Sequence, residues 1–223
     1  MTQKTCYYCG AAASSVEHVP PKAIFPESKD AAPLVDLRKN LVTVPSCTLH
    51  NESVSKDDEY VAGVLWSTHG NNEAGQVQIK KLQRMASNGR GLVKLLAQNY
   101  QRDPNSVLGT LRVDVSRFIS VFEKVIRGVY FHSTKTALPS HASYNIVFPT
   151  LKSDDPDLQP VWATLLSSMA QIPEDKWKLV DGFENPLAFT VEQVIDIEPP
   201  IYYFAIYDSF EAIAIPRSFT LKP

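Results

Sequence analysis

The 223-residue sequence contains only three cysteines and no run of about 20 consecutive apolar residues. The lack of such a run excludes an ordinary transmembrane helix. The N-terminal residues lack the apolar segment of a secretory signal peptide, and three cysteines do not suit a disulfide framework, which uses an even number. We therefore expect an intracellular, cytoplasmic protein with reduced cysteines and no membrane contact.

Several catalytic motifs are also missing from the sequence. The glycine-containing segment 89–91 is not followed by the Lys-Ser/Thr pair of a phosphate-binding loop, and no serine lies in a Gly-x-Ser-x-Gly turn. His69, His132 and His141 do not share the spacing of metal ligands. The sequence also has no internal repeat or low-complexity segment. These absences argue against a P-loop nucleotide hydrolase, an α/β-hydrolase and a repeat protein.

All three cysteines fall into one pattern with a histidine. Cys6 and Cys9 form Cys-x2-Cys, and after a long gap Cys47 and His50 form Cys-x2-His. A two-residue spacer lets one tight turn present two ligands, and tetrahedral zinc needs four ligands of this type. The spacing therefore predicts one closed, structural zinc site.

Between the two halves of this pattern lies a Glu17-His18 pair in a short β-prone stretch that ends at two prolines. Histidine titrates nearest neutrality and accepts a proton from water at cellular pH, whereas a carboxylate holds a hard cation. Neighbouring side chains of a strand point to opposite faces, so the two residues are able to serve different partners. By itself, such a pair is more typical of a solvated strand end.

The order of these segments resembles the HNH endonuclease family over roughly residues 5–66. The matching segments are Cys6-x2-Cys9, Glu17-His18-Val19-Pro20, Asn40-Leu41-Val42, Cys47-x2-His50-Asn51 and Ser55-Lys56-Asp57-Asp58. The resemblance implies a β-hairpin followed by a helix, a catalytic divalent cation, and a zinc site that joins the hairpin to the helix.

The same resemblance implies roles for individual residues. His18 corresponds to the general base, and Glu17 to the first ligand of the catalytic cation, where the family more often has aspartate. Asn40 corresponds to the residue that orients the base, unless it is simply a turn asparagine before a strand. Asn51 corresponds to the final metal ligand, and Lys56 to a basic residue near the phosphate.

Phosphodiester hydrolysis explains why these residue types occur together. Mg²⁺ or Mn²⁺ held by only two protein oxygens would keep positions for water and phosphate. A general base contributes about 10² to 10⁴-fold to such a reaction. We interpret Asp57, Asp58 and Glu59 as charges at a helix N-terminus rather than as catalytic groups.

The net charge of −2 conceals an uneven distribution along the chain. Residues 1–60 carry a net −2, residues 61–135 carry eleven Lys or Arg against four Asp or Glu for +7, and residues 136–223 carry −7. A basic stretch after a nuclease-like motif favours a phosphate-binding surface, although each single lysine is more typical of a solvated helix face. The densest basic cluster is Lys80, Lys81, Arg84, Arg90 and Lys94.

Composition and hydrophobic periodicity predict an α+β fold with a core, because 44% of the residues are hydrophobic and 21% charged. We expect a zinc-clamped ββα module at 1–66, then a helical and mixed α+β part at 67–223, basic and mainly helical at 67–135 and acidic and strand-rich at 136–223. After residue 66, the predicted helices are 71–87, 89–101, 115–126 after an Asp114 cap, and 158–170. The predicted strands are 107–113, 144–148, 187–195 and 201–215, with Tyr202, Tyr203 and Phe204 more typical of a sheet core than of base stacking.

The leading hypothesis is therefore a metal-dependent DNA endonuclease, with RNA not excluded as substrate. Its C-terminal part would control substrate choice or bind a partner. The resemblance also implies a role in restriction, phage defence or toxicity, with an ATPase as a conceivable partner. The alternative is a zinc-stabilised nucleic-acid-binding or interaction module without catalytic activity. Retention of His18 with Glu17 and Asn51 favours the enzyme, because a pure binder needs no base beside a carboxylate.

Overall fold

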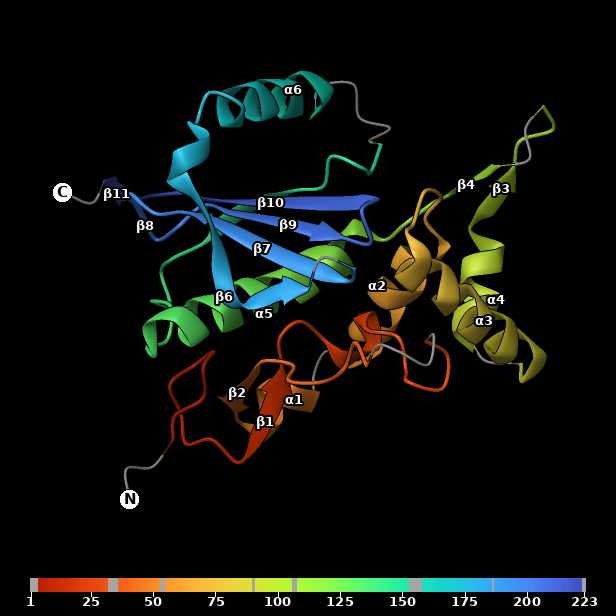
Figure 1. Cartoon of the computed structure of the whole chain (residues 1–223), viewed down its shortest axis with the longest axis horizontal. Coiled ribbons are helices and arrows are strands. Elements are labelled where there is room, and N and C mark those ends of the chain that lie inside the picture. The colour runs from red at the N-terminus through yellow and green to blue at the C-terminus, as the bar shows by residue number, and fades with distance from the viewer. Residues whose placement is uncertain are drawn as a thin grey trace.

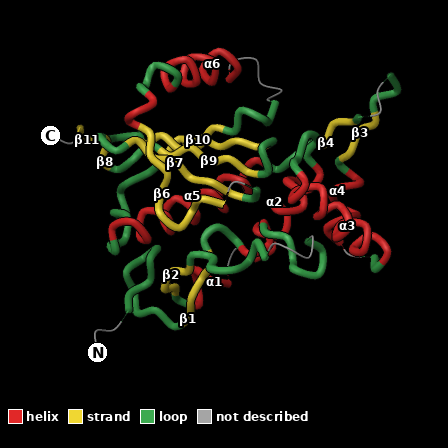
Figure 2. Tube along the Cα trace, in the orientation of Figure 1, coloured by secondary structure: helices red, strands yellow, loops and turns green. Residues whose placement is uncertain are grey.

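A computed structural model describes residues 4–31, 36–52, 55–89, 91–105, 108–152, 158–185 and 187–221. The fold is α+β, as predicted, and Figure 1 shows the arrangement of its elements. The N-terminal elements are β1 (Ser15–His18), the 3-10 turn η1 (Lys22–Ile24), β2 (Thr43–Ser46), α1 (Thr48–Glu52) and α2 (Ser55–Ser67). β1 and β2 form an antiparallel hairpin in which His18 lies opposite Thr43. Much of the chain around this hairpin is loop (Figure 2).

The next elements follow α2 in the chain and precede the five-stranded sheet. They are α3 (Glu73–Ser87), α4 (Gly91–Gln98), β3 (Tyr100–Arg102), β4 (Gly109–Leu111) and α5 (Val115–Thr134). The C-terminal elements are β5 (Tyr144–Val147), α6 (Leu158–Met169), the 3-10 turn η2 (Glu174–Lys176), β6 (Trp177–Asn185), β7 (Phe189–Val194), β8 (Ile197–Glu198), β9 (Tyr202–Ile206), β10 (Phe210–Pro216) and β11 (Thr220–Leu221). Five strands form an antiparallel sheet in the order β5-β10-β9-β7-β6, with α5 on one face and α6 on the other (Figure 1).

Alternation along the strands separates the two faces of this sheet. In β9, Tyr202 and Phe204 are fully buried on the α5 side, and Phe204 packs edge-to-face against Phe122 of α5 at 5.5 Å. Tyr203 lies on the α6 side, in a smaller cluster with Leu166 of that helix. The sequence predicts that these aromatic residues lie in the core of a sheet, and this is confirmed for Tyr202 and Phe204.

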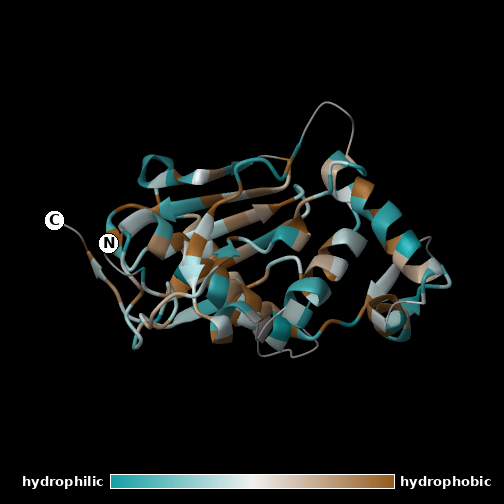
Figure 3. Ribbon diagram, turned by 90° about the horizontal axis from the view of Figure 1, so that it is seen from below, coloured by the Kyte–Doolittle hydropathy of each residue, from teal (hydrophilic) through white to brown (hydrophobic). Residues whose placement is uncertain are grey.

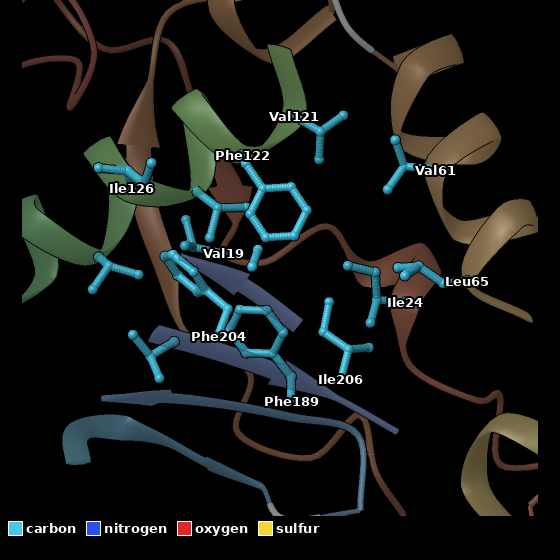
Figure 4. Close-up of a cluster of buried hydrophobic side chains, with 14 of the residues drawn as sticks. Val19, Ile24, Val61, Leu65, Val121, Phe122, Ile126, Phe189, Phe204 and Ile206 are labelled. Carbon is cyan, nitrogen blue, oxygen red and sulfur yellow. The ribbon is translucent and has the colours of Figure 1, made fainter. Parts of the chain in front are cut away.

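Helix α5 joins the hairpin to the sheet. Asp114 caps it as predicted, because its carboxylate accepts a hydrogen bond from the backbone N–H of Ser116. Figure 4 shows the shared core, which collects side chains from the N-terminal segment, α2, α5 and the sheet. The labelled residues are Val19, Ile24, Val61, Leu65, Val121, Phe122, Ile126, Phe189, Phe204 and Ile206. Residues on both sides of the predicted division at 66 and 67 thus share one core, and the division itself stays a prediction.

Helices α2, α3 and α4 pack together at the other end of the molecule, where β3 and β4 form a separate two-stranded ribbon. The helices show both hydrophilic and hydrophobic segments, as expected for amphipathic elements (Figure 3). Among the described residues, no helix is both long and apolar enough to cross a bilayer.

Several predicted boundaries are wrong for identifiable reasons. The predicted helix 89–101 ends at Gln98, because Tyr100 starts a strand that pairs with the chain at Leu111. The predicted strand 201–215 is interrupted at Tyr207 and Asp208, whose φ angles of 55° and 59° form the turn between β9 and β10. On the predicted apolar face of α5, Phe118, Phe122, Val125 and Ile126 are buried, but Val115 and Ile119 are 40% and 39% exposed.

Candidate metal centre and active site

Cys6, Cys9, Cys47 and His50 lie together and form what we call the metal-ligand cluster. Their ligand atoms are all within 4.8 Å of one another. The Cys47 Sγ lies 3.2 Å from His50 Nδ1, the Cys6 Sγ lies 3.8 Å from the same nitrogen, and the Cys9 and Cys47 sulfurs are 4.0 Å apart. Zn–S bonds of about 2.3 Å and Zn–N bonds of about 2.0 Å imply similar separations between tetrahedral ligands. This cluster could therefore hold a metal ion such as zinc.

Local backbone structure brings these ligands together. The backbone N–H of Gly10 donates to the carbonyl of Cys6, and Gly10 has a φ of 73°, which glycine adopts without strain. Burial acts to raise the pKa of the Cys6 thiol, but hydrogen bonds from the backbone at Cys9, Cys47 and Tyr8 outweigh it, so the pKa is lowered. The thiolate is the form that binds zinc.

His50 is held from both sides of the cluster. Its backbone N–H donates to the carbonyl of Cys47, and its ring stacks on Tyr8 with centroids 4.3 Å apart. Tyr8 in turn lies under the guanidinium of Arg127 of α5 at 4.7 Å. The His50 side chain is thus held in position, and it could serve as a ligand although it ends a less common Cys-x2-His pair.

His18 lies at the end of β1, on the edge of a hollow of about 250 Å³, which we call the His18 hollow. Burial lowers the pKa of His18, and the positive charges of Lys22 and Arg38 lower it further, against an opposing effect of Glu17. The lowered pKa favours the neutral imidazole, which is the form that accepts a proton. The residues that line the hollow are Glu17, His18, Pro21, Lys22, Ala23, Asn51, Ser55, Asp58 and Glu59.

Glu17 is buried and already has two partners. The Tyr7 hydroxyl donates to its Oε2 at 2.8 Å, and the ammonium of Lys124, from α5, forms an ion pair with its Oε1. The Lys124 and Glu17 side chains are only 6% and 9% exposed. Sequence reasoning missed Lys124, although a lysine within the apolar stripe of α5, between Val121 and Gly128, was a signal for a buried partner.

Replacing Lys124 with methionine is expected to destabilise the protein by about 3 to 5 kcal/mol, because it leaves the buried Glu17 carboxylate without its cation. Urea unfolding of wild type and variant measures this change. The double variant Lys124→Met, Glu17→Gln should recover part of the loss, since the unpaired charge of Glu17 is then removed as well. Equal loss in the single and double variants would show that the ion pair is not the cause.

Asp58 lies in the first turn of α2, as expected from the sequence, and it also lines the His18 hollow. Its Oδ2 is 3.7 Å from Lys124 Nζ, and its Oδ1 is buried with no hydrogen-bond partner among the described residues. Burial raises the pKa of Asp58 to about 6, and the nearby negative charge of Glu17 adds to this, whereas Lys124 opposes it. No spacing rule indicated this residue, because its burial depends on α5, which comes much later in the chain.

This raised pKa predicts a pH effect on stability. A carboxyl with a pKa of about 6 in the folded protein and 3.8 in the unfolded chain stabilises the fold below pH 4, and that contribution is lost as the pH rises through 6. Relative to wild type, Asp58→Asn should therefore gain up to about 3 kcal/mol of unfolding free energy between about pH 4 and pH 7. Denaturant unfolding of both proteins across this range measures the difference, with Asp57→Asn as the control for loss of a neighbouring charge. A difference that does not change with pH would contradict the expectation.

Asn51 and Asn40 have different surroundings. In α1, the Asn51 amide nitrogen donates to Ser15 Oγ at 3.1 Å, which makes Oδ1 the atom that would face a cation. Asn40 is exposed in a turn with a φ of 59° and lines a separate hollow with Val42 and Phe183. Among the described residues, no hydrogen bond or ion pair joins it to His18, and its role in orienting the base stays a prediction. Lys56 is exposed on the first turn of α2 and is not among the residues that line the His18 hollow.

The predicted basic cluster is partly engaged in intrachain contacts. Lys81 lies 3.2 Å from Glu27 and 4.8 Å above the ring of Trp66, and Arg84 lies 2.6 Å from Asp30. Lys80 and Lys94 are exposed. Arg90 lies outside the described residues.

Comparisons with protein-family models, curated proteins and solved structures found no match to this chain.

Proposed function

We propose that this protein is a metal-dependent endonuclease that hydrolyses phosphodiester bonds in DNA. One observation carries the proposal: His18, whose pKa is lowered by burial, shares a hollow with the oxygen-bearing side chains of Glu17, Asn51 and Asp58. A general base beside hard oxygen donors is the arrangement that metal-assisted hydrolysis requires.

Each of these residues would have a separate role in the reaction. His18 takes a proton from the attacking water at its unprotonated ring nitrogen. Glu17 and Asn51 would hold Mg²⁺ or Mn²⁺, and the buried Oδ1 of Asp58, which has no hydrogen-bond partner among the described residues, fits a site for a hard cation. When bound, the cation supplies stabilisation of charge at the scissile phosphate. Lys56 is proposed to lie near that phosphate.

The metal-ligand cluster has a structural role in this proposal. It joins the loop that precedes β1 to the start of α1, which carries Asn51, and so fixes the spacing between the two sides of the His18 hollow. A closed four-ligand zinc site leaves no position for water, so zinc would not take part in the reaction.

The basic segment 61–135 supports a nucleic-acid substrate. Its net charge of +7 favours binding to phosphates through release of counterions. In the predicted cluster, the side chains of Lys80 and Lys94 are exposed and able to contact phosphates. Lys81 and Arg84 instead form ion pairs within the chain.

Supercoiled plasmid cleavage tests the proposal. We expect nicking or linearisation by purified, zinc-loaded protein when Mg²⁺ or Mn²⁺ is added, and none without added cation. Zinc content is measured in both samples, so that loss of cleavage is not confused with loss of the structural ion. Cleavage that is independent of added cation, or no cleavage of plasmid or single-stranded DNA, would contradict the proposal.

One observation favours the alternative of a zinc-stabilised binding module. Both carboxylate oxygens of Glu17 already have partners in Tyr7 and Lys124, so a cation would have to share that carboxylate. The alternative predicts DNA retention in a gel-shift assay without cleavage at any cation concentration. The same plasmid experiment therefore separates the two functions.

A further inference from the structure

The α6 face of the sheet holds another hollow, far in sequence from the metal-ligand cluster. Its volume is about 510 Å³, and we call it the α6 groove. Helix α6 covers this face incompletely, since none of its described side chains from residue 160 to 169 is fully buried. Volumes of about 300 to 1,000 Å³ are typical of ligand sites. The residues that line the groove are Leu166, Met169, Glu174, Trp177, Glu192, Tyr203, Glu211 and Ile213.

Two aromatic rings form the centre of the groove. Trp177 of β6 and Tyr203 of β9 lie edge-to-face, with centroids 6.5 Å apart and planes at 78°. Leu166 and Met169 of α6 and Ile213 of β10 add hydrocarbon around them. The groove therefore offers an apolar surface to a long side chain.

Three carboxylates surround these rings. The sheet register places Glu192 directly opposite Tyr203, and the Tyr203 hydroxyl donates to Glu211 Oε1 at 2.7 Å. Glu174 belongs to η2, just before β6. The lining includes no lysine or arginine, and within the described residues no ion pair joins these glutamates to a cation. Nearby Lys176 is paired with Asp196 at 2.6 Å.

Carboxylates beside aromatic faces are complementary to a cation with an apolar stem. Such a cation is stabilised by contact with the ring faces, by burial of its stem against hydrocarbon and by the negative charges of the carboxylates. A bare metal ion would use the carboxylates but would leave the rings without a partner. Arginine suits this chemistry best, because its planar guanidinium both stacks on rings and pairs with carboxylates.

We propose that the α6 groove binds an arginine-bearing peptide segment of a partner protein, with the guanidinium among Glu174, Glu192 and Glu211 and its stem against Trp177 and Tyr203. The excess of negative charge in residues 136–223, which is −7, favours the approach of such a segment. The inference does not depend on the proposed nuclease activity.

Fluorescence polarisation with a labelled peptide of alternating glycine and arginine tests this inference. The matched probe has citrulline in place of arginine, which keeps the shape and removes the charge. Measurements use full-length protein at about 150 mM salt, where interactions between distant surface charges are largely screened. We expect saturable binding of the arginine peptide and at least about tenfold weaker binding of the citrulline peptide.

Two double variants locate the binding site. Glu174→Gln with Glu192→Gln removes two groove charges and should weaken binding by about tenfold or more. Glu73→Gln with Glu123→Gln removes two exposed charges outside the groove and should change binding less than about twofold. Trp177→Leu should also weaken binding, which attraction by charge alone would not explain. Thermal unfolding confirms that each variant is folded.

Three results would overturn the inference. They are no saturable binding of the arginine peptide up to about 1 mM, equal binding of the citrulline peptide, and equal loss in the two double variants. Equal loss in the two double variants would show that the peptide is attracted to the acidic surface in general and not to the groove.

Discussion

Replacing His18 with alanine is expected to lower cation-dependent plasmid cleavage by about 10² to 10⁴-fold, the usual contribution of a positioned general base. The side chain has a lowered pKa and faces the His18 hollow, so its imidazole is in the form that accepts a proton. It belongs neither to the metal-ligand cluster nor to the buried core. The variant should therefore fold, retain zinc and retain DNA in a shift assay.

His69→Ala is the matched control for this experiment, because His69 is an exposed histidine outside the hollow. The control should cleave at the wild-type rate. Wild-type cleavage by His18→Ala, in protein free of contaminating nuclease, would remove His18 from the mechanism. Loss of zinc together with activity would instead indicate a structural role.

The pH profile provides a further check on the same residue. Because burial, Lys22 and Arg38 lower the pKa of His18, the acid limb of the cleavage profile should lie below that of an ordinary histidine. Lys22→Met removes one of these charges and should move the acid limb to higher pH. An unchanged limb would show that another group controls it.

Replacing Cys47 with alanine is expected to have the largest effect on stability. Structural zinc contributes about 10 to 16 kcal/mol of binding free energy, which is as large as the total stability of a typical domain. Cys47 contacts two other ligands, since its Sγ lies near both Cys9 and His50. The variant should lose zinc and lose the ordered hairpin of β1 and β2.

Zinc content and thermal unfolding measure this effect. Leu49→Ala is a suitable control, because Leu49 lies in α1, which starts directly after Cys47, is 70% exposed and does not belong to the metal-ligand cluster. The control should retain zinc and the wild-type unfolding temperature. A Cys47→Ala protein with full zinc and unchanged stability would show that the ligand assignment is wrong.

Local chemistry explains what could be predicted from the sequence. The metal-ligand cluster follows from two short spacers, each of which is a single turn. The cap at Asp114 and the buried positions of α5 follow from helical periodicity. Both kinds of signal lie within a few residues of the structure they predict.

Long-range contacts explain what could not be predicted. Lys124 and Glu17 form a buried pair although α5 and β1 are distant in the chain, and the partly buried Asp58 lies beside that pair. Strand β6 was missed because its pairing with β7 shifts between Leu179 and Glu184, where Gly182 has a φ of 83°. A bulge of this kind disrupts the alternation that indicates a strand.

The position of Lys124 also limits how the N-terminal motif could be used apart from the rest of the chain. A fragment containing residues 1–66 would keep Glu17 and Asp58 but lose the only ammonium that contacts both in the described structure. It would also expose Val19, Val61 and Leu65, which the remaining chain helps to cover. The N-terminal motif is therefore not expected to fold or act by itself. Its transfer to another protein would require an equivalent of α5 whose lysine contacts both Glu17 and Asp58.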